Sequence, residues 1–421
     1  MNRLARLVAE VLGPDPPVAV ELHDGTVVGR ADAAARLVIR SPNVLRRLLT
    51  APGELGFARA YVAGELDIDG DLYAALRLRE HFAGRRLQPK QWLAAARIVT
   101  SAGLRPLSPP PEEAHLGGRR HTRERDFAAI RHHYDVSNRF YRLVLGPSLT
   151  YSCAVWDDPA GTLEDAQAAK HELVCTKLGL QEGMRLLDVG CGWGGMLLHA
   201  AVHHGVSAVG VTLSARQAEF ARERVRDAGV ADRVEVRLAD YRDLGDERFD
   251  AISSIGMFEH VGLANLRLYF RRLFGLLDPG GRLLNHGIAR PRNIRARFRR
   301  RGFVDRYVFP DGELHELGSV VSTMQAGGFE PRNTESLREH YALTLRAWVA
   351  NLESSWAEAV SEVGAARARI WRLYMFGSAL GFEAGRLQVH QVLAVRAHGG
   401  VSGMPLRPGT WARESAGQQQ V

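Results

Sequence analysis

A glycine-rich turn behind an acidic residue is the strongest chemical signal in this sequence. Asp188 is followed by Gly190, Gly192 and Gly194 in the stretch Leu186-Leu-Asp-Val-Gly-Cys-Gly-Trp-Gly-Gly195. Glycine lets the backbone approach a ligand closely and adopt dihedral angles that a side chain disfavours. The helix predicted from about residue 194 would add unpaired N–H groups and the positive end of its dipole. The stretch therefore predicts a strand, a turn and a helix that together bind a nucleotide.

The spacing of the glycines narrows the choice of ligand. A dinucleotide-binding fingerprint has the form G-x-G-x-x-G, and a phosphate-binding loop ends in Gly-Lys followed by Ser or Thr. Here one residue separates each glycine from the next, and no lysine follows directly. The arrangement resembles the first motif of class I S-adenosylmethionine (SAM) methyltransferases. Taken alone it leaves an ordinary turn or another nucleotide open, so the remaining motifs must decide.

The elements around the turn predict the sheet that positions it. Strands and helices alternate from about 184 to 286, which is typical of a parallel sheet with crossover helices. A doubly wound sheet binds its ligand beyond the carboxyl ends of its strands. The polar residues that fall at such ends are Asp188, Thr212, Asp240, Ser254 and His286. We therefore predict an α/β catalytic domain in which these residues lie near one another.

Other segments flank this catalytic domain. Residues 1–103 predict a small α+β domain without a catalytic signature, in which 64–70 reads as a turn-rich break. Residues 104–120 are rich in proline, which favours an extended linker. The catalytic domain would span 121–398, beginning with helix over about 124–145, and 399–421 would form a loose tail.

Charge and composition limit the classes of partner. The chain has 421 residues, a net charge of +8 and a pI near 9.7, and arginine carries almost all of the positive charge. This excess favours phosphate-bearing partners, either nucleic acid or anionic lipid headgroups. No apolar run is long enough to cross a membrane and the N-terminus does not read as a signal peptide, so we expect a cytoplasmic protein. Cys153, Cys175 and Cys191 lack disulfide or metal-ligand spacing, and no metal is expected.

The end of the second predicted strand departs from the usual methyltransferase pattern. Most SAM methyltransferases have an acid there that holds the ribose hydroxyls, whereas this chain has Thr212. The segments that accompany this departure are HYDVSN (133–138), LTYSCA (149–154), DYRD (240–243), GMFEHVG (256–262), YVFP (307–310) and HYALTLRAW (340–348). Together they resemble the cyclopropane-fatty-acyl-phospholipid synthases, a family related to the mycolic acid cyclopropane synthases and with an actinobacterial branch that makes methylene fatty acids. The resemblance covers about 120–396 and extends more weakly over 1–103.

The resemblance implies a set of SAM-binding residues at the strand ends and a class I SAM-methyltransferase fold. The residues around the methionine part of SAM would be Tyr151, Ser152, Asp188, Gly190, Gly192 and Gly194. The residues on the ribose and adenine side would be Thr212, Leu213, Gln217, Asp240 and Tyr241.

The resemblance also implies a bicarbonate ion in the active site. Its ligands would be backbone groups of Cys153 and Ile288 and the side chains of Glu259, His286 and Tyr341. Methyl transfer from the sulfonium of SAM to a cis double bond leaves a carbocation, and a small anion can then act as general base and counter-charge. Read in isolation, Glu259 also fits a surface helix start, and His286 and Tyr341 also fit core positions.

The implied activity is transfer of a one-carbon unit from SAM to the cis double bond of an unsaturated phospholipid acyl chain. Immediate loss of a proton from the new methyl group gives a cyclopropane. A hydride shift before that loss gives a methylene branch, which a separate reductase would convert to a methyl branch. The sequence leaves the product, the acyl chain length, the headgroup and the oligomeric state open, a homodimer among the options.

A basic segment favours a membrane surface as the place of reaction. Residues 289–306 carry eight arginines against one aspartate, interleaved with apolar residues, and Arg119, Arg120, Arg123 and Arg125 would add to it. We expect peripheral association with the inner face of the membrane, although a solvated helix face has the same pattern. The alternatives are a nucleic-acid methyltransferase and a non-catalytic lipid-binding relative. No nucleic-acid-binding motif accompanies the charge, and every implied bicarbonate position is filled.

Overall fold

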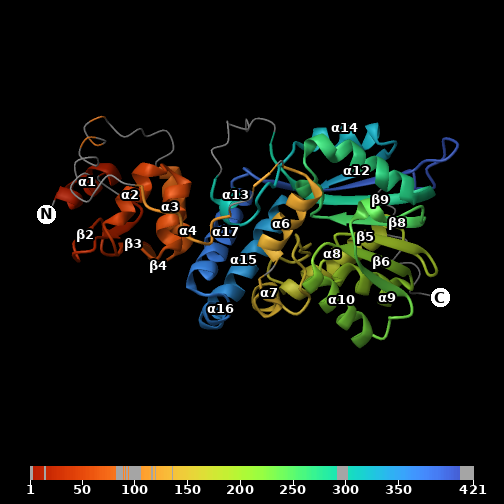
Figure 1. Cartoon of the computed structure of the whole chain (residues 1–421), viewed down its shortest axis with the longest axis horizontal. Coiled ribbons are helices and arrows are strands. Elements are labelled where there is room, and N and C mark those ends of the chain that lie inside the picture. Colours follow the sequence, from red (N-terminus) through yellow and green to blue (C-terminus); the bar gives the residue numbers. More distant parts are fainter. Residues whose placement is uncertain are drawn as a thin grey trace. The chain divides into compact units, whose positions relative to one another are not determined.

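The computed structural model describes residues 3–13, 16–81, 106–114, 117–118, 120–134, 136–291 and 302–407, together with Pro89, Gln91 and Leu93. Contacts divide the chain into two compact units (Figure 1). The first comprises 1–115, 298–310 and 355–380, and the second comprises 116–297, 311–354 and 381–421. The boundaries drawn along the chain from sequence, 1–103, 104–120 and 121–398, remain a prediction.

The first unit contains a small sheet with strand order β2-β1-β3-β4. Its strands are β1 (Ala19–Glu21), β2 (Val27–Val28), β3 (Ala35–Ile39) and β4 (Leu66–Gly70). Its helices are α1 (Arg3–Leu12), α2 (Asn43–Thr50), α3 (Glu54–Val62), α4 (Leu72–His81), α13 (Phe303–Tyr307), α16 (Trp356–Val363) and most of α17 (Ala365–Glu383). The prediction of a turn-rich break at 64–70 is wrong. Leu66 and Ile68 alternate with aspartates and point into the core, and this period-two pattern forms β4.

The second unit is built on a seven-stranded sheet with strand order β10-β11-β9-β8-β5-β6-β7. The strands are β5 (Arg185–Val189), β6 (Ser207–Thr212), β7 (Val234–Leu238), β8 (Phe249–Ile255), β9 (Leu277–Ala289), β10 (Glu330–Ser336) and β11 (Gln388–Val395). The strands from β7 to β9 run parallel, whereas β11 pairs antiparallel with both β9 and β10. The predicted doubly wound α/β fold is confirmed.

Helices cover both faces of this sheet (Figure 1). One face packs against α8 (Leu163–Leu178), α9 (Gly195–His204) and α10 (Ala215–Asp227), and the other packs against α12 (Leu263–Leu276) and α14 (Leu317–Ala326). The alternation along β5 assigns Leu186 to the first core and Leu187 to the second, and both are fully buried. Each such leucine contributes about 1.5–3 kcal/mol through burial, which fixes the strand beneath the glycine-rich turn.

Two predicted helices are each broken once more than expected. The stretch 124–145 forms α6 (Arg123–Tyr134) and α7 (Asn138–Leu145), because the Ser137 hydroxyl accepts the N–H groups of Arg139 and Phe140 and starts a new helix. The sequence also predicts a long helix over about 340–360, but that stretch forms two helices, α15 (Arg338–Ser354) and α16.

Some predictions fall on residues that the structure does not describe. They are most of the predicted helix at 91–101, the basic segment from 292 to 301 and the tail from 408 onward. Among the described residues, no helix has both the length and the apolar character needed to cross a membrane.

Candidate active site

The glycine-rich turn forms one wall of a pocket at the carboxyl ends of β5 and β6. Gly190, Gly192 and Gly194 have φ angles of +80°, +54° and +81°, in the left-handed region that favours glycine. A Cβ atom on Gly190 would clash with the Sδ atom of Met257, so the Met257 side chain would have to move to accept it. Around Gly192 a Cβ atom would meet nothing within 4 Å, which leaves the backbone open to a ligand.

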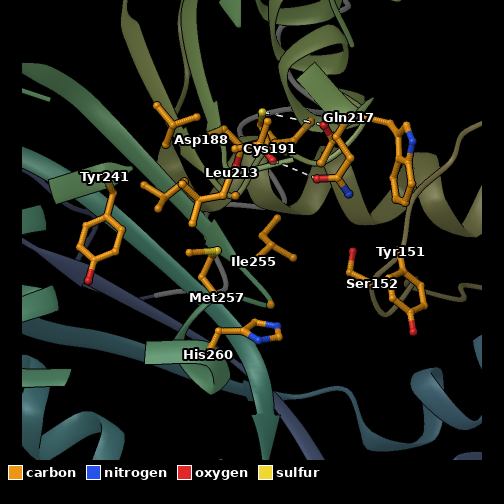
Figure 2. Close-up of a pocket in the computed structure, with 18 of the residues that line it drawn as sticks. Tyr151, Ser152, Asp188, Cys191, Leu213, Gln217, Tyr241, Ile255, Met257 and His260 are labelled. Atoms are coloured by element: carbon orange, nitrogen blue, oxygen red, sulfur yellow. Dashed lines mark hydrogen bonds between the residues drawn. The ribbon is translucent and has the colours of Figure 1, made fainter. Parts of the chain in front are cut away.

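The pocket contains nearly all of the residues predicted to bind SAM. Those that line it are Tyr151, Ser152, Asp188, Gly190, Gly192, Thr212, Leu213, Gln217, Asp240 and Tyr241. Gly194 does not line it, because a Cβ there would face Ala221 of α10 at 3.3 Å; the next residue, Gly195, lines the pocket. Figure 2 shows Asp188, Cys191 and Leu213 on one side, facing Ile255, Met257 and His260. Tyr241 and Tyr151 stand at opposite ends of this view.

Asp188 is a buried carboxylate at the end of β5. Ser253 donates its hydroxyl hydrogen to Asp188 Oδ1 at 2.6 Å. Burial raises the pKa of Asp188 to about 6, although the Ser253 hydrogen bond and the Lys170 charge act in the opposite direction. Burial also lowers the pKa of Lys170 to about 8. Its ammonium group donates to Ser152 Oγ at 3.1 Å.

Thr212 takes the position of the usual ribose-binding acid without a charge. Its hydroxyl donates to Gln217 Oε1 at 2.9 Å and accepts the Ser214 amide at 3.2 Å. The Ser214 hydroxyl in turn caps α10 by accepting the Gln217 amide. The local sequence therefore fixes a neutral donor–acceptor pair where the pocket wall turns from β6 into α10.

Asp240 and Tyr241 close the far end of the pocket. The Asp240 carboxylate accepts the Arg242 amide at 2.9 Å and caps the short 3₁₀ helix Tyr241–Asp243. Burial alone would raise the pKa of Asp240, but the hydrogen bonds from Arg242 outweigh it and lower that pKa. Tyr241 packs edge-on against Tyr269, with ring centroids 4.8 Å apart. This end therefore offers an aromatic face beside an ionised carboxylate.

Helix α8 supplies pocket residues that sequence reasoning missed. Lys170 and His171 both line the pocket, although they lie in the middle of α8, well before Asp188 in the chain. The available signal was weak: Lys170 is one of the few lysines in an arginine-rich chain and lies on the buried side of its helix.

The residues predicted to hold bicarbonate form a separate set, which we call the acid–base group: Cys153, Glu259, His286, Ile288 and Tyr341. None of them lines the pocket described above. Glu259 lies in the short helix α11 (Phe258–Val261), and its Oε1 atom accepts the Ile288 amide at 2.7 Å. Its Oε2 atom is buried without a hydrogen-bond partner among the described residues. Burial raises the pKa of Glu259 to about 7, so the carboxyl group exchanges its proton near neutral pH.

One backbone carbonyl joins Cys153 to Tyr341. The Leu337 carbonyl accepts the Cys153 thiol at 3.6 Å and the Tyr341 amide at 3.0 Å. The Leu337 amide donates to the Val389 carbonyl, and Val389 pairs with Ile288 across β11 and β9. These contacts connect Cys153 and Tyr341 to Ile288 through the first residues of β11.

The proton position on His286 follows from its neighbours. Lys177 donates to Gln391 Oε1 at 2.6 Å, which leaves the Gln391 amide nitrogen to face His286 Nδ1 at 3.4 Å. Because that nitrogen can only donate, Nδ1 accepts, and the proton of the neutral ring lies on Nε2. Burial lowers the pKa of His286 to about 3, so the ring is neutral at physiological pH. His286 is therefore a fixed hydrogen-bond donor through Nε2.

An aromatic series links the pocket to the acid–base group. The Tyr151 ring packs on Trp348 at 5.3 Å, and Trp348 packs edge-on against Tyr341 at 5.9 Å. The chain also runs directly from Tyr151 and Ser152, which line the pocket, to Cys153. The two sets of residues are thus neighbours with different surroundings.

The arginines predicted to extend a membrane-binding patch are largely engaged within the protein. Arg125 is buried and paired with Asp311, which also pairs with Arg120 at 3.1 Å. Arg123 pairs with Asp243 at 2.9 Å. Arg125 is therefore buried in the fold and has no surface for lipid, whereas Arg120 and Arg123 are paired but remain exposed.

The parallel strands, the glycine-rich turn and the covering helices define a class I SAM methyltransferase. The mycolic acid cyclopropane synthetase family model matches residues 121–392. The chain therefore belongs to this family and is a SAM-dependent methyltransferase of the cyclopropane synthase type. Membership supports SAM-dependent methylation or cyclopropanation of lipid acyl chains.

Relatives extend over most of the chain. A probable fatty acid methyltransferase of Mycobacterium tuberculosis is 46% identical over 404 residues, covering 93% of this chain and 94% of that protein. The cyclopropane-fatty-acyl-phospholipid synthase of Escherichia coli is 33% identical over 368 residues, covering 86% of this chain and 88% of that protein. The crystal structure of mycolic acid cyclopropane synthase CmaA1 complexed with SAH and CTAB matches with a TM-score of 0.60 at 36% identity, covering 64% of this chain and 97% of that one.

Proposed function

We propose that this protein transfers the methyl group of SAM to the cis double bond of an unsaturated phospholipid acyl chain and then removes a proton to give a cyclopropane or a methylene branch. The observation that carries the proposal is the pairing of two neighbouring sets of residues: a pocket built on a glycine-rich turn and a buried acid–base group with an unpaired carboxylate oxygen.

The pocket suits SAM in shape and charge. The open backbone at Gly192 would receive the methionine part, and Tyr151 and Ser152 would close over it. The neutral Thr212–Gln217 pair would contact the ribose, and Tyr241 would face the adenine beside Asp240. Burial holds His171 and His260 neutral by lowering their pKa values, so these two rings add no positive charge near a sulfonium.

The acid–base group suits a small anion. Glu259 Oε2 needs a hydrogen donor, and His286 offers one through Nε2. A bound bicarbonate ion would supply the general base that accepts the proton of the new methyl group. Glu259 would accept the hydroxyl hydrogen of that anion. His286 and Tyr341 would donate hydrogen bonds to its oxygens. The Ile288 amide already donates to Glu259, so it would contribute by fixing that carboxylate.

Methyl transfer to a vesicle substrate tests the activity. Purified full-length protein would be incubated with SAM and oleoyl-phospholipid vesicles, and the lipids analysed by mass spectrometry and NMR. We expect acyl chains heavier by one CH₂. Cyclopropane resonances would indicate direct ring closure, and olefinic CH₂ signals would indicate a methylene branch that a separate reductase would complete. Unchanged lipids in the presence of bound SAM would refute the proposal.

Removal of bicarbonate tests the base. In buffer freed of carbon dioxide we expect turnover to fall and added bicarbonate to restore it, with SAM binding unchanged. Equal turnover in both buffers would assign the base to Glu259 itself, whose pKa of about 7 suits that role.

The proposed place of reaction is the inner face of the membrane, with the protein bound there peripherally. Sedimentation with anionic and with neutral vesicles would test it, and we expect preference for anionic lipid. A parallel assay with RNA and DNA tests the alternative substrate, for which we expect no methyl incorporation.

A further inference from the structure

A second cluster of chemically reactive side chains lies away from the acid–base group, where α8 and α9 pack against each other. We call it the α8–α9 cluster: Glu172 and Cys175 on α8, and His199 and His204 on α9. The Cys175 Sγ atom and one ring nitrogen of each histidine all lie within 4.8 Å of one another. Glu172 Oε2 lies 3.1 Å from His199 Nε2 and 3.0 Å from His204 Nε2.

The local fold explains why these residues meet. Glu172 and Cys175 are three residues apart on α8, so they project from one face of the helix. His199 lies within α9, and His204 is its last residue, where Gly205 with φ +63° ends the helix. Cys175 closes the inner side of the cluster as part of the hydrophobic core.

We propose that the α8–α9 cluster binds a divalent transition-metal ion of the zinc type, with His199, His204, Cys175 and Glu172 as its ligands. Imidazole, thiolate and carboxylate are the ligands that zinc takes in proteins. Tetrahedral coordination with bonds of about 2.0–2.3 Å separates ligand atoms by about 3.3–3.8 Å. The thiol and ring nitrogens lie within 4.8 Å of one another, so the side chains would close by about 1 Å or less around an ion.

The exposed fractions of these side chains and the position of the Cys175 thiol favour a metal site over a simple ion pair between Glu172 and two histidines. The histidine side chains are 14% and 19% exposed, whereas the Glu172 side chain is 47% exposed, so an ion has a path from solvent past the carboxylate. A plain ion pair would use the carboxylate and the two rings and give the buried Cys175 thiol no part. The thiol and the two rings form a group of three mutually close donors, and Glu172, bonded to both rings, would add a fourth.

A metal ion here would join two walls of the pocket. Lys170 and His171, just before Glu172 on α8, line the pocket, and α9 starts there with Gly195 and Met196. The ion would therefore fix α8 against α9 beneath the glycine-rich turn. This consequence for SAM rests on the proposed function, whereas metal binding itself does not.

The test is a titration of the purified full-length protein with Co²⁺ and with Zn²⁺ after removal of bound metal. We expect one ion per chain and a cobalt–thiolate absorption band that Zn²⁺ displaces. Cys175→Ser should abolish the band, and His199→Ala and His204→Ala should each weaken binding by about 100-fold or more. Glu172→Gln, on the exposed edge, should weaken binding without affecting the fold, which keeps the test decisive if Cys175→Ser fails to fold.

The matched control is His203→Gln. His203 is exposed on the same helix, with its ring 4.6 Å from that of His199, and it is not among the four proposed ligands. We expect its variant to bind metal as the unaltered protein does. Binding without a thiolate band, or equal loss in His203→Gln and His199→Ala, would show adventitious binding by surface histidines and overturn the proposal. The absorption readout does not involve SAM, so failure of methyl transfer would leave this result standing.

Discussion

The SAM pocket and the acid–base group are neighbours that are built in opposite ways. The pocket is made by the main chain at strand ends, with glycines in left-handed conformations and short polar side chains around them. The acid–base group is made by side chains from distant segments, buried so deeply that Glu259 and His286 have strongly shifted pKa values. Under the proposed function, cofactor recognition would depend on backbone geometry and proton transfer on a dry environment, each supplied by a different part of the domain.

The largest expected effect is on turnover. Glu259→Gln and His286→Ala should each lower turnover by about 10²–10⁴-fold, because they remove the groups that hold the base. SAM affinity should not change, since neither residue lines the pocket. Lipid assays would measure turnover, and titration calorimetry with SAM would measure affinity. Loss of SAM binding in either variant would contradict the assignment of separate roles to the pocket and to the acid–base group.

The second effect concerns stability and its pH dependence. Burial raises the pKa of Glu259 from 4.5 to about 7, so its contribution to folding is fully present below pH 4.5 and lost as pH rises through 7. The loss amounts to about 3 kcal/mol. Glu259→Gln, which cannot ionise, should therefore be more stable than the unaltered protein at pH 8 and nearly equally stable at pH 4. Denaturant unfolding at both pH values measures the difference, and equal stability at pH 8 would contradict the burial argument.

The third effect addresses the backbone side of the comparison. Gly190→Ala forces a left-handed residue and a clash with Met257, a strain of about 1–3 kcal/mol, and should weaken SAM binding by about 10–100-fold. Gly229→Ala is the matched control, because Gly229 has φ +69° but open space around it and does not line the pocket. The control should lose stability and keep SAM affinity. Calorimetric titration with SAM distinguishes the two variants.

The smallest effect tests the hydrogen bonds behind His286. Gln391→Leu removes the donor to Nδ1, so the ring can exchange its tautomer, and we expect kcat to fall about tenfold. The KM for SAM should be unchanged and the pH profile of turnover should shift. Gln388→Leu, on the same strand, serves as control, because the Gln388 side chain bonds only to His390 in the described part of the chain. If Gln391→Leu has the same pH profile of turnover as the unaltered protein, Gln391 contributes only packing.

Local motifs explain what the sequence predicted well. The strand–turn–helix around Asp188 and the alternation that follows it are short-range patterns, so most of the sheet was accessible from spacing alone. Spacing also grouped Asp188, Thr212 and Asp240, which do line the pocket, whereas the other pocket residues were implied by the family resemblance. Strand β10 was missed because Glu330–Ser336 is polar on both faces and has no alternation. It is held by pairing with β11 instead. Lys177 and Gln391, which orient His286, are far apart in the chain and meet only in the folded sheet.

The same reasoning applies to the α8–α9 cluster. The spacing of the cysteines gave no reason to expect a metal, since only Cys175 takes part and its partners are histidines on the next helix. Ligands spread over two helices leave no compact motif in the sequence. Only the packing of α8 on α9 reveals them.

The position of β11 sets the order in which the enzyme is completed during synthesis. This strand is formed by Gln388–Val395, after every other element of the sheet, yet it lies between β9 and β10. It supplies both Val389, which anchors the segment bearing Tyr341, and Gln391, which orients His286. A chain still emerging from the ribosome can form the glycine-rich turn and parallel strands long before it can form the acid–base group. The acid–base group is therefore completed last, when β11 pairs between β9 and β10.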